Sequence, residues 1–184
     1  MVRMQVVSNT TEQPLFKINA CAGGNPLPGY FNVDIKEGPG IDGVYDLGGK
    51  FPWTDSIVDE IYINCALEHL PNVTTFMCES WRVLKNGGKL KIIVPWFNSG
   101  ISPHPFHRNQ FSFAWFKYWL VNSERKGIYE FDTLDAFEGF KIVKDKINYY
   151  PIISWIPCEK IKRKLCLMIG DLCSTISTEL ECVK

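Results

Sequence analysis

The stretch that most constrains this fold is KINACAGGNPLPGYFNVDI, residues 17–35. It reads as two short apolar strands joined by a glycine turn, with Asp34 near the end of the second strand. In many parallel α/β proteins an acid at this place binds the ribose of a nucleotide. Only residues 21–30 separate the two apolar runs, and they include Pro26 and Pro28. A long helix is therefore not expected directly after the turn, because proline and glycine disfavour it.

The short crossover argues against a dinucleotide. The dinucleotide fingerprint is G-x-G-x-x-G with an acid about 20 residues further on, and it places the diphosphate at a helix N-terminus. Here Asp34 follows Gly24 by 10 positions and the fingerprint is absent. The turn instead suits a nucleoside or adenosyl ligand, since glycines allow close backbone approach and a carboxylate can accept both ribose hydroxyls. Asp46, at the end of the next predicted strand, is placed to accept from the exocyclic amine of adenine.

Strand and helix signals alternate to about residue 95. Short runs rich in β-branched and aromatic residues predict strands over 15–20, 31–35, 43–47, 58–65 and 89–95. A helix between the last two has Asn72 as N-cap and Asn86-Gly87-Gly88 as its stop. Its sheet-facing residues are Val73, Phe76, Met77, Trp81 and Leu84. Such a strand–helix–strand unit is parallel and right-handed, which places a ligand site at the carboxyl ends of the strands.

The second half is less regular. Residues 96–108 are predicted to form a loop, 109–122 an aromatic helix, 140–150 a strand, 158–169 a helix and 176–183 a closing strand. The apolar face of the helix over 158–169 would be Ile161, Leu165, Met168 and Ile169. The aromatic residues of 96–119 are expected either in the core or in a lid over a substrate. No domain boundary is evident, so we expect one domain over 1–184, with a cofactor half at about 15–95 and a substrate or lid region at about 96–135.

Charge and cysteine usage restrict the class of protein. Lys plus Arg and Asp plus Glu both number 20, so no basic excess favours nucleic acid as a partner. No apolar run reaches 18 residues, and the first 14 residues do not read as a signal peptide, so no transmembrane segment is expected. The seven cysteines form no C-x-x-C pair. We therefore expect free thiols and a cytoplasmic location.

Four stretches in order resemble one family. They are NACAGGNPLPGYFNVDI (19–35), VYDL (44–47), DEIYINCALEHL (59–70) and RVLKNGGKLKIIVP (82–95). Together they resemble the class I S-adenosylmethionine-dependent methyltransferases, in particular the small bacterial and archaeal type with an L-E-H-L motif. The resemblance covers about residues 15–115. It implies an α/β, Rossmann-like three-layer sandwich, with a mostly parallel twisted sheet of about seven strands and an antiparallel C-terminal strand.

The resemblance assigns residues to the cofactor S-adenosylmethionine. They are Cys21, Ala22, Gly23, Asp34, Asp46, Leu47, Asn64 and Cys65. The first three would lie beneath the methionine part and Asp34 would bind the ribose. Asp46 and the backbone of Leu47 would read the adenine edge, while Asn64 and Cys65 would face the methionine amine and the methyl group. Cys21 departs from the family, because it stands where the first glycine of G-x-G is expected and adds a side chain there.

The histidines are the candidates for a general base. His69 lies in LEHL, and His104 and His107 lie in SPHPFHR after the fifth predicted strand. A hydroxyl acceptor needs a base, which an imidazole can provide. The alternative is that these rings only cap a helix or line the pocket. The H-x-x-H pair has no third ligand close in sequence, so no metal site is predicted.

Two functions of different classes remain open. NCALEHL stands where methyltransferases acting on nucleobases or glutamine amides carry N-P-P-Y, so the expected acceptor is a small molecule or a sugar hydroxyl. The alternative is a non-catalytic domain that serves as a binding or assembly module, which Cys21 favours. Asp34, Asp46 and LEHL favour the enzyme.

The sequence does not predict the oligomeric state. One basic segment has two interpretations. Lys160, Lys162, Arg163 and Lys164 mark a solvated helix face or, with the apolar YYPIISWIP before them, a weak contact with a membrane surface.

Overall fold

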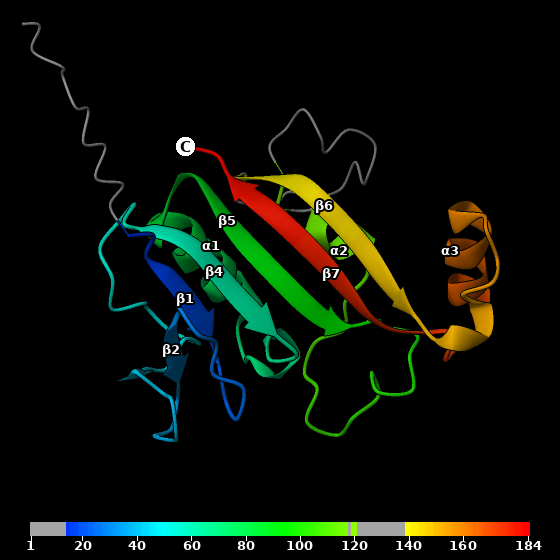
Figure 1. Cartoon of the computed structure of the whole chain (residues 1–184), viewed down its shortest axis with the longest axis horizontal. Helices are drawn as coiled ribbons and strands as arrows, with labels where there is room; N and C mark the ends of the chain where they lie inside the picture. Colours follow the sequence, from blue (N-terminus) through cyan, green and yellow to red (C-terminus); the bar gives the residue numbers. More distant parts are fainter. Residues whose placement is uncertain (1–13, 118, 121–138) are drawn as a thin grey trace, which may run out of the picture.

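A single mixed sheet of seven strands, in the order β3-β2-β1-β4-β5-β7-β6, dominates the structure (Figure 1). The computed structural model describes residues 14–117, 119–120 and 139–184. The strands are β1 (Lys17–Ala20), β2 (Phe31–Asp34), β3 (Gly43–Val44), β4 (Val58–Asn64), β5 (Leu84–Pro95), β6 (Phe140–Tyr149) and β7 (Cys173–Cys182). Strands β1 to β5 pair in parallel, and β7 runs antiparallel to both β5 and β6. The predicted mostly parallel, Rossmann-like sheet with an antiparallel closing strand is confirmed.

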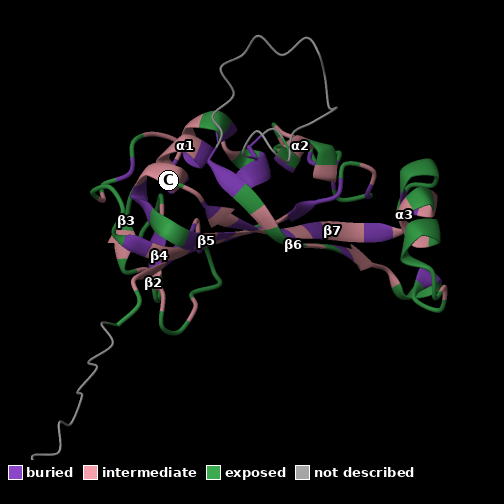
Figure 2. Ribbon diagram, turned by 90° about the horizontal axis from the view of Figure 1, so that it is seen from above, coloured by how far each residue is buried: buried purple, intermediate pink, exposed green. Residues whose placement is uncertain are grey.

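Helices α1 (Val73–Val83) and α2 (Phe113–Lys117) lie on the same face of this sheet, as Figure 2 shows. The strand residues that are buried on that face are Ile18, Ala20, Val33, Ile61, Ile63, Leu90, Ile92, Val94, Ile176 and Leu180. Residues 21–30 and 35–42, which join the first three strands, contain no helix. Among the described residues, the second helical layer of the predicted three-layer sandwich is therefore not seen.

The opposite face of the sheet carries charged side chains. Lys91 Nζ lies 2.8 Å from Glu60 Oε2, and Lys89 pairs with Glu181. Parallel strands are usually covered on both faces and apolar throughout. Here polar and apolar residues alternate along β4, β5 and β7, which gives the sheet one solvated face. Partly exposed ion pairs of this kind contribute about 0–1 kcal/mol each, so the stability of the sheet comes mainly from its buried face.

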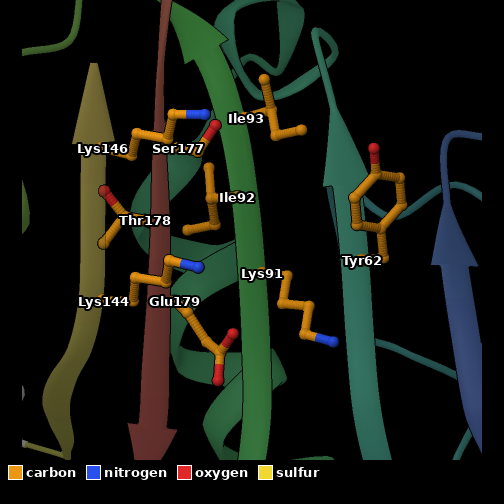
Figure 3. Close-up of a pocket in the computed structure, with 9 residues that line it drawn as sticks. All are labelled: Tyr62, Lys91, Ile92, Ile93, Lys144, Lys146, Ser177, Thr178 and Glu179. Carbon is orange, nitrogen blue, oxygen red and sulfur yellow. The ribbon is translucent and has the colours of Figure 1, made fainter. Parts of the chain in front are cut away.

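A hollow of about 210 Å³ lies on the charged face, over the middle of β5 and β7 (Figure 3). Its lining residues are Tyr62, Lys91, Ile92, Ile93, Lys144, Lys146, Ser177, Thr178 and Glu179. Ligands of open α/β sheets bind outside the carboxyl ends of the strands. This hollow lies at mid-strand, so it is not the ligand site that the topology predicts.

Helix α1 begins as predicted and ends earlier. The backbone N–H of Thr75 donates to Asn72 Oδ1 at 3.0 Å, which confirms Asn72 as the N-cap. The helix ends at Val83, and Leu84, which is fully buried, already belongs to β5. The expected helix stop at 86–88 is therefore wrong.

Residues 86–88 instead form an irregularity within β5. The pairing with β4 shifts there from Val58–Leu84 to Glu60–Lys89, and Gly87 has a φ of +79°. A Cβ at Gly88 would lie 2.9 Å from the carbonyl oxygen of Lys85. The glycines are thus needed for the shift in strand register and not for the end of a helix.

The aromatic segment forms less helix than predicted. Of the expected helix over 109–122, only α2 is helical among the described residues, and Phe111 forms a bridge with Trp96. Phe111 and Phe116 are fully buried, which supports the core interpretation for these two rings. Residues 118 and 121–135, which include much of the predicted lid region, lie outside the described residues, as do residues 1–13 at the start of the predicted domain.

Helix α3 (Glu159–Met168) follows the short 3-10 helix η3 (Pro151–Ile153) at the end of β6, and its predicted apolar face does not pack on the sheet. Ile161 is 52% exposed, and Met168 and Ile169 are exposed as well. Cys166 is its buried residue. In Figure 2 the helix stands beyond the end of the sheet, which explains why helical spacing alone misjudged its burial.

No described helix is long and apolar enough to cross a bilayer. All seven cysteines lie among the described residues and are free, in agreement with the sequence-based expectation.

Candidate functional site

The carboxyl ends of β1, β2, β4 and β5 meet at one edge of the sheet (Figure 1). Because the chain runs from β1 outward to β3 and then returns to β4 on the other side, a crevice is expected between β1 and β4. Two adjoining cavities lie there. The smaller, of about 270 Å³, is lined by Cys21, Asp34, Ile35, Tyr45, Asp46, Leu47, Ala66, His69 and Leu70. The larger, of about 480 Å³, is lined by Cys65, Glu68, His69, Pro95, Gly100, Ile101, Pro103, His104, Pro105 and His107.

Asp34 ties the glycine turn to the end of β2. Its Oδ2 accepts a hydrogen bond from the backbone N–H of Gly23 at 2.8 Å, and its Oδ1 accepts one from Lys36 at 3.3 Å. Gly23 has a φ of +52°, which suits glycine. A carboxylate offers about four acceptor positions, so Asp34 keeps capacity for two hydroxyl donors beyond these two bonds. Asp34, the residue predicted to bind the ribose, thus lines the smaller cavity and also holds the glycine turn in place.

Asp46 and several apolar residues line the smaller cavity together with Asp34. Asp46 Oδ1 accepts from the backbone N–H of Gly48 at 2.8 Å. Leu47 is buried, whereas Ile35 is 61% exposed and lines the same cavity with Tyr45. Sequence reasoning missed Ile35 and Tyr45. The position of Ile35, an apolar residue directly after the acid at the strand end, could have indicated that it lines the cavity.

Cys21 also lines the smaller cavity. Its φ is +54°, a conformation that costs a residue with a Cβ about 1–2 kcal/mol. This geometry explains why a glycine is expected at the position. Burial, together with the carboxylates of Asp34, Asp46 and Glu68, raises the pKa of the Cys21 thiol to about 12. The thiol is therefore protonated and unreactive at neutral pH.

The other predicted cofactor residues separate into groups. Ala22 and Gly23 form the turn without lining either cavity, and Ala22 donates to Val33 O at 2.8 Å. Cys65, with a φ of +48°, lines the larger cavity and not the smaller. Asn64 is exposed and lines neither, so the structure does not bring it together with the others. Cys21, Asp34, Asp46 and Leu47 are the members that share one cavity.

The three histidines gather around the larger cavity. The ring centroids of His69 and His107 lie 4.7 Å apart, and those of His104 and His107 lie 5.1 Å apart. His69 comes from the 3-10 helix η1 (Leu67–His69), and the other two come from the loop after β5. The fold therefore assembles all three predicted base candidates.

Hydrogen bonds distinguish the three rings. His69 Nδ1 lies 3.1 Å from the carbonyl oxygen of Phe106, and His107 Nδ1 lies 3.0 Å from that of Ser102. A carbonyl oxygen only accepts, so Nδ1 carries the proton and Nε2 carries the lone pair in both neutral rings. In His104, Nδ1 instead accepts from the N–H of Phe106 at 3.4 Å. His69 and His107 thus present a basic Nε2, whereas His104 does not.

Sequence reasoning did not assign a role to Glu68, which lines the larger cavity. Its backbone carbonyl accepts from Arg108 N at 2.8 Å and from Asn109 N at 3.2 Å, which fastens the loop to η1. Its side chain is 2% exposed, and Oε2 has no hydrogen-bond partner among the described residues. Burial raises the pKa of the Glu68 carboxyl above its ordinary value. In the sequence, only its position within LEHL, a charged residue between two leucines, could have indicated this role.

Comparison with known proteins adds to this geometry. Residues 41–92 match the sequence profile of a methyltransferase domain. No curated protein sequence matches the chain. The matched segment runs from the loop before β3 to the middle of β5, and it includes Asp46, Cys65 and LEHL.

Solved structures share the fold at low sequence identity. An S-adenosylmethionine-dependent methyltransferase from Archaeoglobus fulgidus matches at 13% identity and a TM-score of 0.57, covering 91% of this chain and 86% of that one. YcgJ from Bacillus subtilis matches at 11% and 0.57, covering 94% and 93%. The [4+2]-cyclase SpnF matches at 10% and 0.56, covering 91% and 74%. The solved structures thus show a shared fold, and the profile match shows that residues 41–92 are similar to a methyltransferase domain.

Proposed function

We propose that this protein is an S-adenosylmethionine-dependent methyltransferase that acts on a small-molecule or sugar acceptor. The observation that carries the proposal is the pair of adjoining cavities at the carboxyl ends of the strands. The smaller holds Asp34 and Asp46, the larger holds two imidazoles with a free Nε2, and His69 lines both. This arrangement supports a nucleoside site in the smaller cavity and an acceptor site with proton acceptors in the larger one.

The residues of the smaller cavity fit the adenosyl part of the cofactor. Asp34 has acceptor capacity left for the ribose hydroxyls, and Asp46 has a carboxylate oxygen beyond the one bonded to Gly48. The apolar surfaces of Ile35 and Leu47 suit the faces of a flat base. No helix follows the turn after β1 within 21–30, so the diphosphate of a dinucleotide lacks its usual helix N-terminus.

The residues of the chain would act mainly by alignment. The cofactor supplies an activated methyl group when bound. Holding an acceptor in line with it reduces the barrier by up to about 7–11 kcal/mol. If the acceptor is a hydroxyl, Nε2 of His69 or His107 takes its proton, a contribution of about 10²- to 10⁴-fold.

The larger cavity supports an acceptor of modest size. Its volume of about 480 Å³ lies within the roughly 300–1,000 Å³ typical of small-molecule sites. Pro95, Ile101, Pro103 and Pro105 contribute apolar surface to its lining.

A second candidate is a domain that keeps the fold without methyl transfer. Cys21 favours it, because its side chain occupies the wall where a glycine is expected. The similarity to SpnF, whose name describes a cyclase, also shows that this fold does not fix the reaction.

Calorimetry with S-adenosylhomocysteine separates the two candidates in part. We expect saturable binding of S-adenosylhomocysteine and none of NAD. Transfer of a labelled methyl group to a panel of hydroxyl compounds then tests the enzyme, with His107→Ala expected to slow transfer and His104→Ala to have less effect. Tight binding of NAD, or failure of the folded protein to bind S-adenosylhomocysteine, would refute the proposal. Binding of cofactor without transfer to any compound would favour the second candidate.

A further inference from the structure

We propose that Glu68, His69 and His107 form a binding site for one divalent transition-metal ion, such as Zn²⁺, in the larger cavity. One potential ligand atom from each of these side chains lies within 4.8 Å of the other two. The sequence suggests no such site, because only His107 of the H-x-x-H pair takes part, and Glu68 and His69 stand 39 and 38 positions before it in the chain. The fold supplies it by placing η1 against the loop.

The buried carboxylate is the first observation that points to a ligand. Glu68 is 2% exposed, and its Oε2 lacks a hydrogen-bond partner among the described residues. A buried carboxylate oxygen without a partner is costly, and proteins usually pair such a group or coordinate it to a metal. Glu68 lines the cavity that also holds both imidazoles. A cation at their common centre would compensate its charge.

The two imidazoles are also oriented as metal ligands are. Metal-binding histidines usually donate their second ring N–H to a carboxylate or backbone carbonyl, which fixes the tautomer. His69 and His107 both meet this condition through Nδ1, toward the carbonyls of Phe106 and Ser102. Their Nε2 atoms are then free to coordinate. His104 has the opposite arrangement, with Nδ1 accepting a backbone N–H.

The ligand types favour a borderline ion over a hard one. Imidazole nitrogens suit Zn²⁺, Fe²⁺, Ni²⁺ and Cu²⁺, whereas Mg²⁺ and Ca²⁺ prefer oxygen ligands throughout. Two histidines and a glutamate are a ligand set of catalytic zinc sites, which keep a further position open. In a tetrahedral zinc site the ligand atoms lie about 3.4 Å apart. His69 is exposed, so its ring can move the short distance that closure requires.

Backbone hydrogen bonds hold the loop that carries His107 against η1, which carries Glu68 and His69. Arg108 N and Asn109 N, directly after His107, both donate to the carbonyl oxygen of Glu68. Asn109 Nδ2 adds a bond of 2.8 Å to Leu70 O on the other side of His69. These three bonds fix the loop to η1 without using any of the proposed ligand atoms. The backbone that carries the three ligands is therefore in place without a metal, and only side-chain movement is needed to close the site.

With both Nε2 atoms on the metal, neither imidazole would accept a proton, so the metal would replace the histidine base. Its open coordination position would face the larger cavity and receive an oxygen of the acceptor, a role that rests on the proposed function. Metal binding itself does not depend on methyl transfer. A protein that takes up Zn²⁺ and fails to bind S-adenosylhomocysteine would keep the metal site and lose the proposed function. A protein that binds S-adenosylhomocysteine and takes up no Zn²⁺ would keep the proposed function and lose the metal site.

The test is a titration of the full chain with Zn²⁺, followed by calorimetry, with Mg²⁺ as the comparison ion. We expect uptake of about one Zn²⁺ per chain and no uptake of Mg²⁺. Because loss of a supporting residue costs about 10- to 100-fold in affinity, His69→Ala and His107→Ala should each cost about 100-fold or more. His104→Ala is the matched control from the same loop and should bind Zn²⁺ like the parent. Glu68→Gln keeps the volume of the buried side chain and should also weaken binding.

Free cysteines require a second readout. Cys65 lines the same cavity but is not part of the ligand group. The absorption spectrum of the Co²⁺-substituted protein should lack thiolate-to-metal charge transfer and should not change in Cys65→Ser. Circular dichroism checks that each variant is folded. The proposal is overturned if the folded parent takes up no Zn²⁺, if uptake survives both histidine variants, or if His104→Ala loses it equally.

Discussion

Substitution of Asp34 is the sharpest test of the cofactor site. A carboxylate that accepts two ribose hydroxyls makes charge-assisted bonds of roughly 1.5–3 kcal/mol each. Because Asp34 is only half-buried, water replaces part of this interaction when the side chain is removed. We therefore expect Asp34→Ala to cost about 2–4 kcal/mol of affinity for S-adenosylhomocysteine, which is on the order of 30- to 1000-fold.

The same substitution should also lower the free energy of unfolding. Asp34→Ala also removes the acceptor of the Gly23 N–H, a bond of 2.8 Å at a solvent-accessible position. We expect a loss of about 1 kcal/mol or less in the free energy of unfolding. Asp34→Asn retains one side-chain oxygen that can hold Gly23, so its stability should stay near that of the parent while its affinity still falls. Calorimetry and denaturant unfolding of both variants separate the two effects.

The control for Asp34 must be a residue without a structural role. Asp42 fails this requirement, because its Oδ2 accepts from Asn32 N at 2.7 Å and from Asn32 Nδ2 at 3.1 Å. Glu37 is exposed, lies three positions after Asp34 and makes no hydrogen bond or ion pair with the described residues. Glu37→Ala should bind like the parent. If Asp34→Ala remains folded and also binds S-adenosylhomocysteine like the parent, the assignment of the cofactor site is refuted.

Three further substitutions test separate features. Cys21→Gly removes a side chain from the cavity wall, so it should tighten S-adenosylhomocysteine binding by up to about tenfold, or 1.4 kcal/mol. Calorimetry measures this change. Unchanged or weaker binding would show that the thiol does not obstruct the cofactor. Gly88→Ala should lower the free energy of unfolding by about 1–3 kcal/mol, since its Cβ would lie 2.9 Å from Lys85 O, and a neutral result in denaturant unfolding would contradict the strand irregularity. The hydrogen bond from Arg82 lowers the pKa of Glu79, so its stabilising contribution is complete above the unfolded-state pKa of about 4.3 and is lost as the pH falls through the folded-state value. Glu79→Gln should therefore unfold with a weaker acid dependence than the parent between about pH 5 and pH 3, and identical acid profiles would exclude this role.

Local patterns predicted the parts of the fold that depend on neighbouring residues. The turn at 21–24, the acid at the end of β2 and the N-cap at Asn72 each follow from residue types within a few positions. The helix end was not predictable in this way. Leu84 leaves α1 because it pairs with Val58 in β4, and that partner lies 26 positions earlier in the chain.

The candidate site was predictable only in part, for the same reason. Asp34, Asp46 and Leu47 follow strand ends, and the sheet brings strand ends together. The role of Glu68 depends on a loop that begins about 30 residues later and covers it, so its burial leaves no local signal. Asn64 is also at a strand end, as the last residue of β4, yet it is exposed and lines neither cavity.

The position of β7 has a consequence for how the protein is made. This strand is the last of the seven in chain order, yet it lies between β5 and β6 and contributes Ile176 and Leu180 to the core. While a ribosome is still adding residues 173–182, β5 has an unpaired edge and β6 has no neighbour in the sheet. Trp81 Nε1 then bonds to Val183 O at 2.8 Å, which fastens α1 to the residue after β7. Because these contacts join distant parts of the chain, the nascent protein should remain open to chaperones and proteases until β7 has emerged.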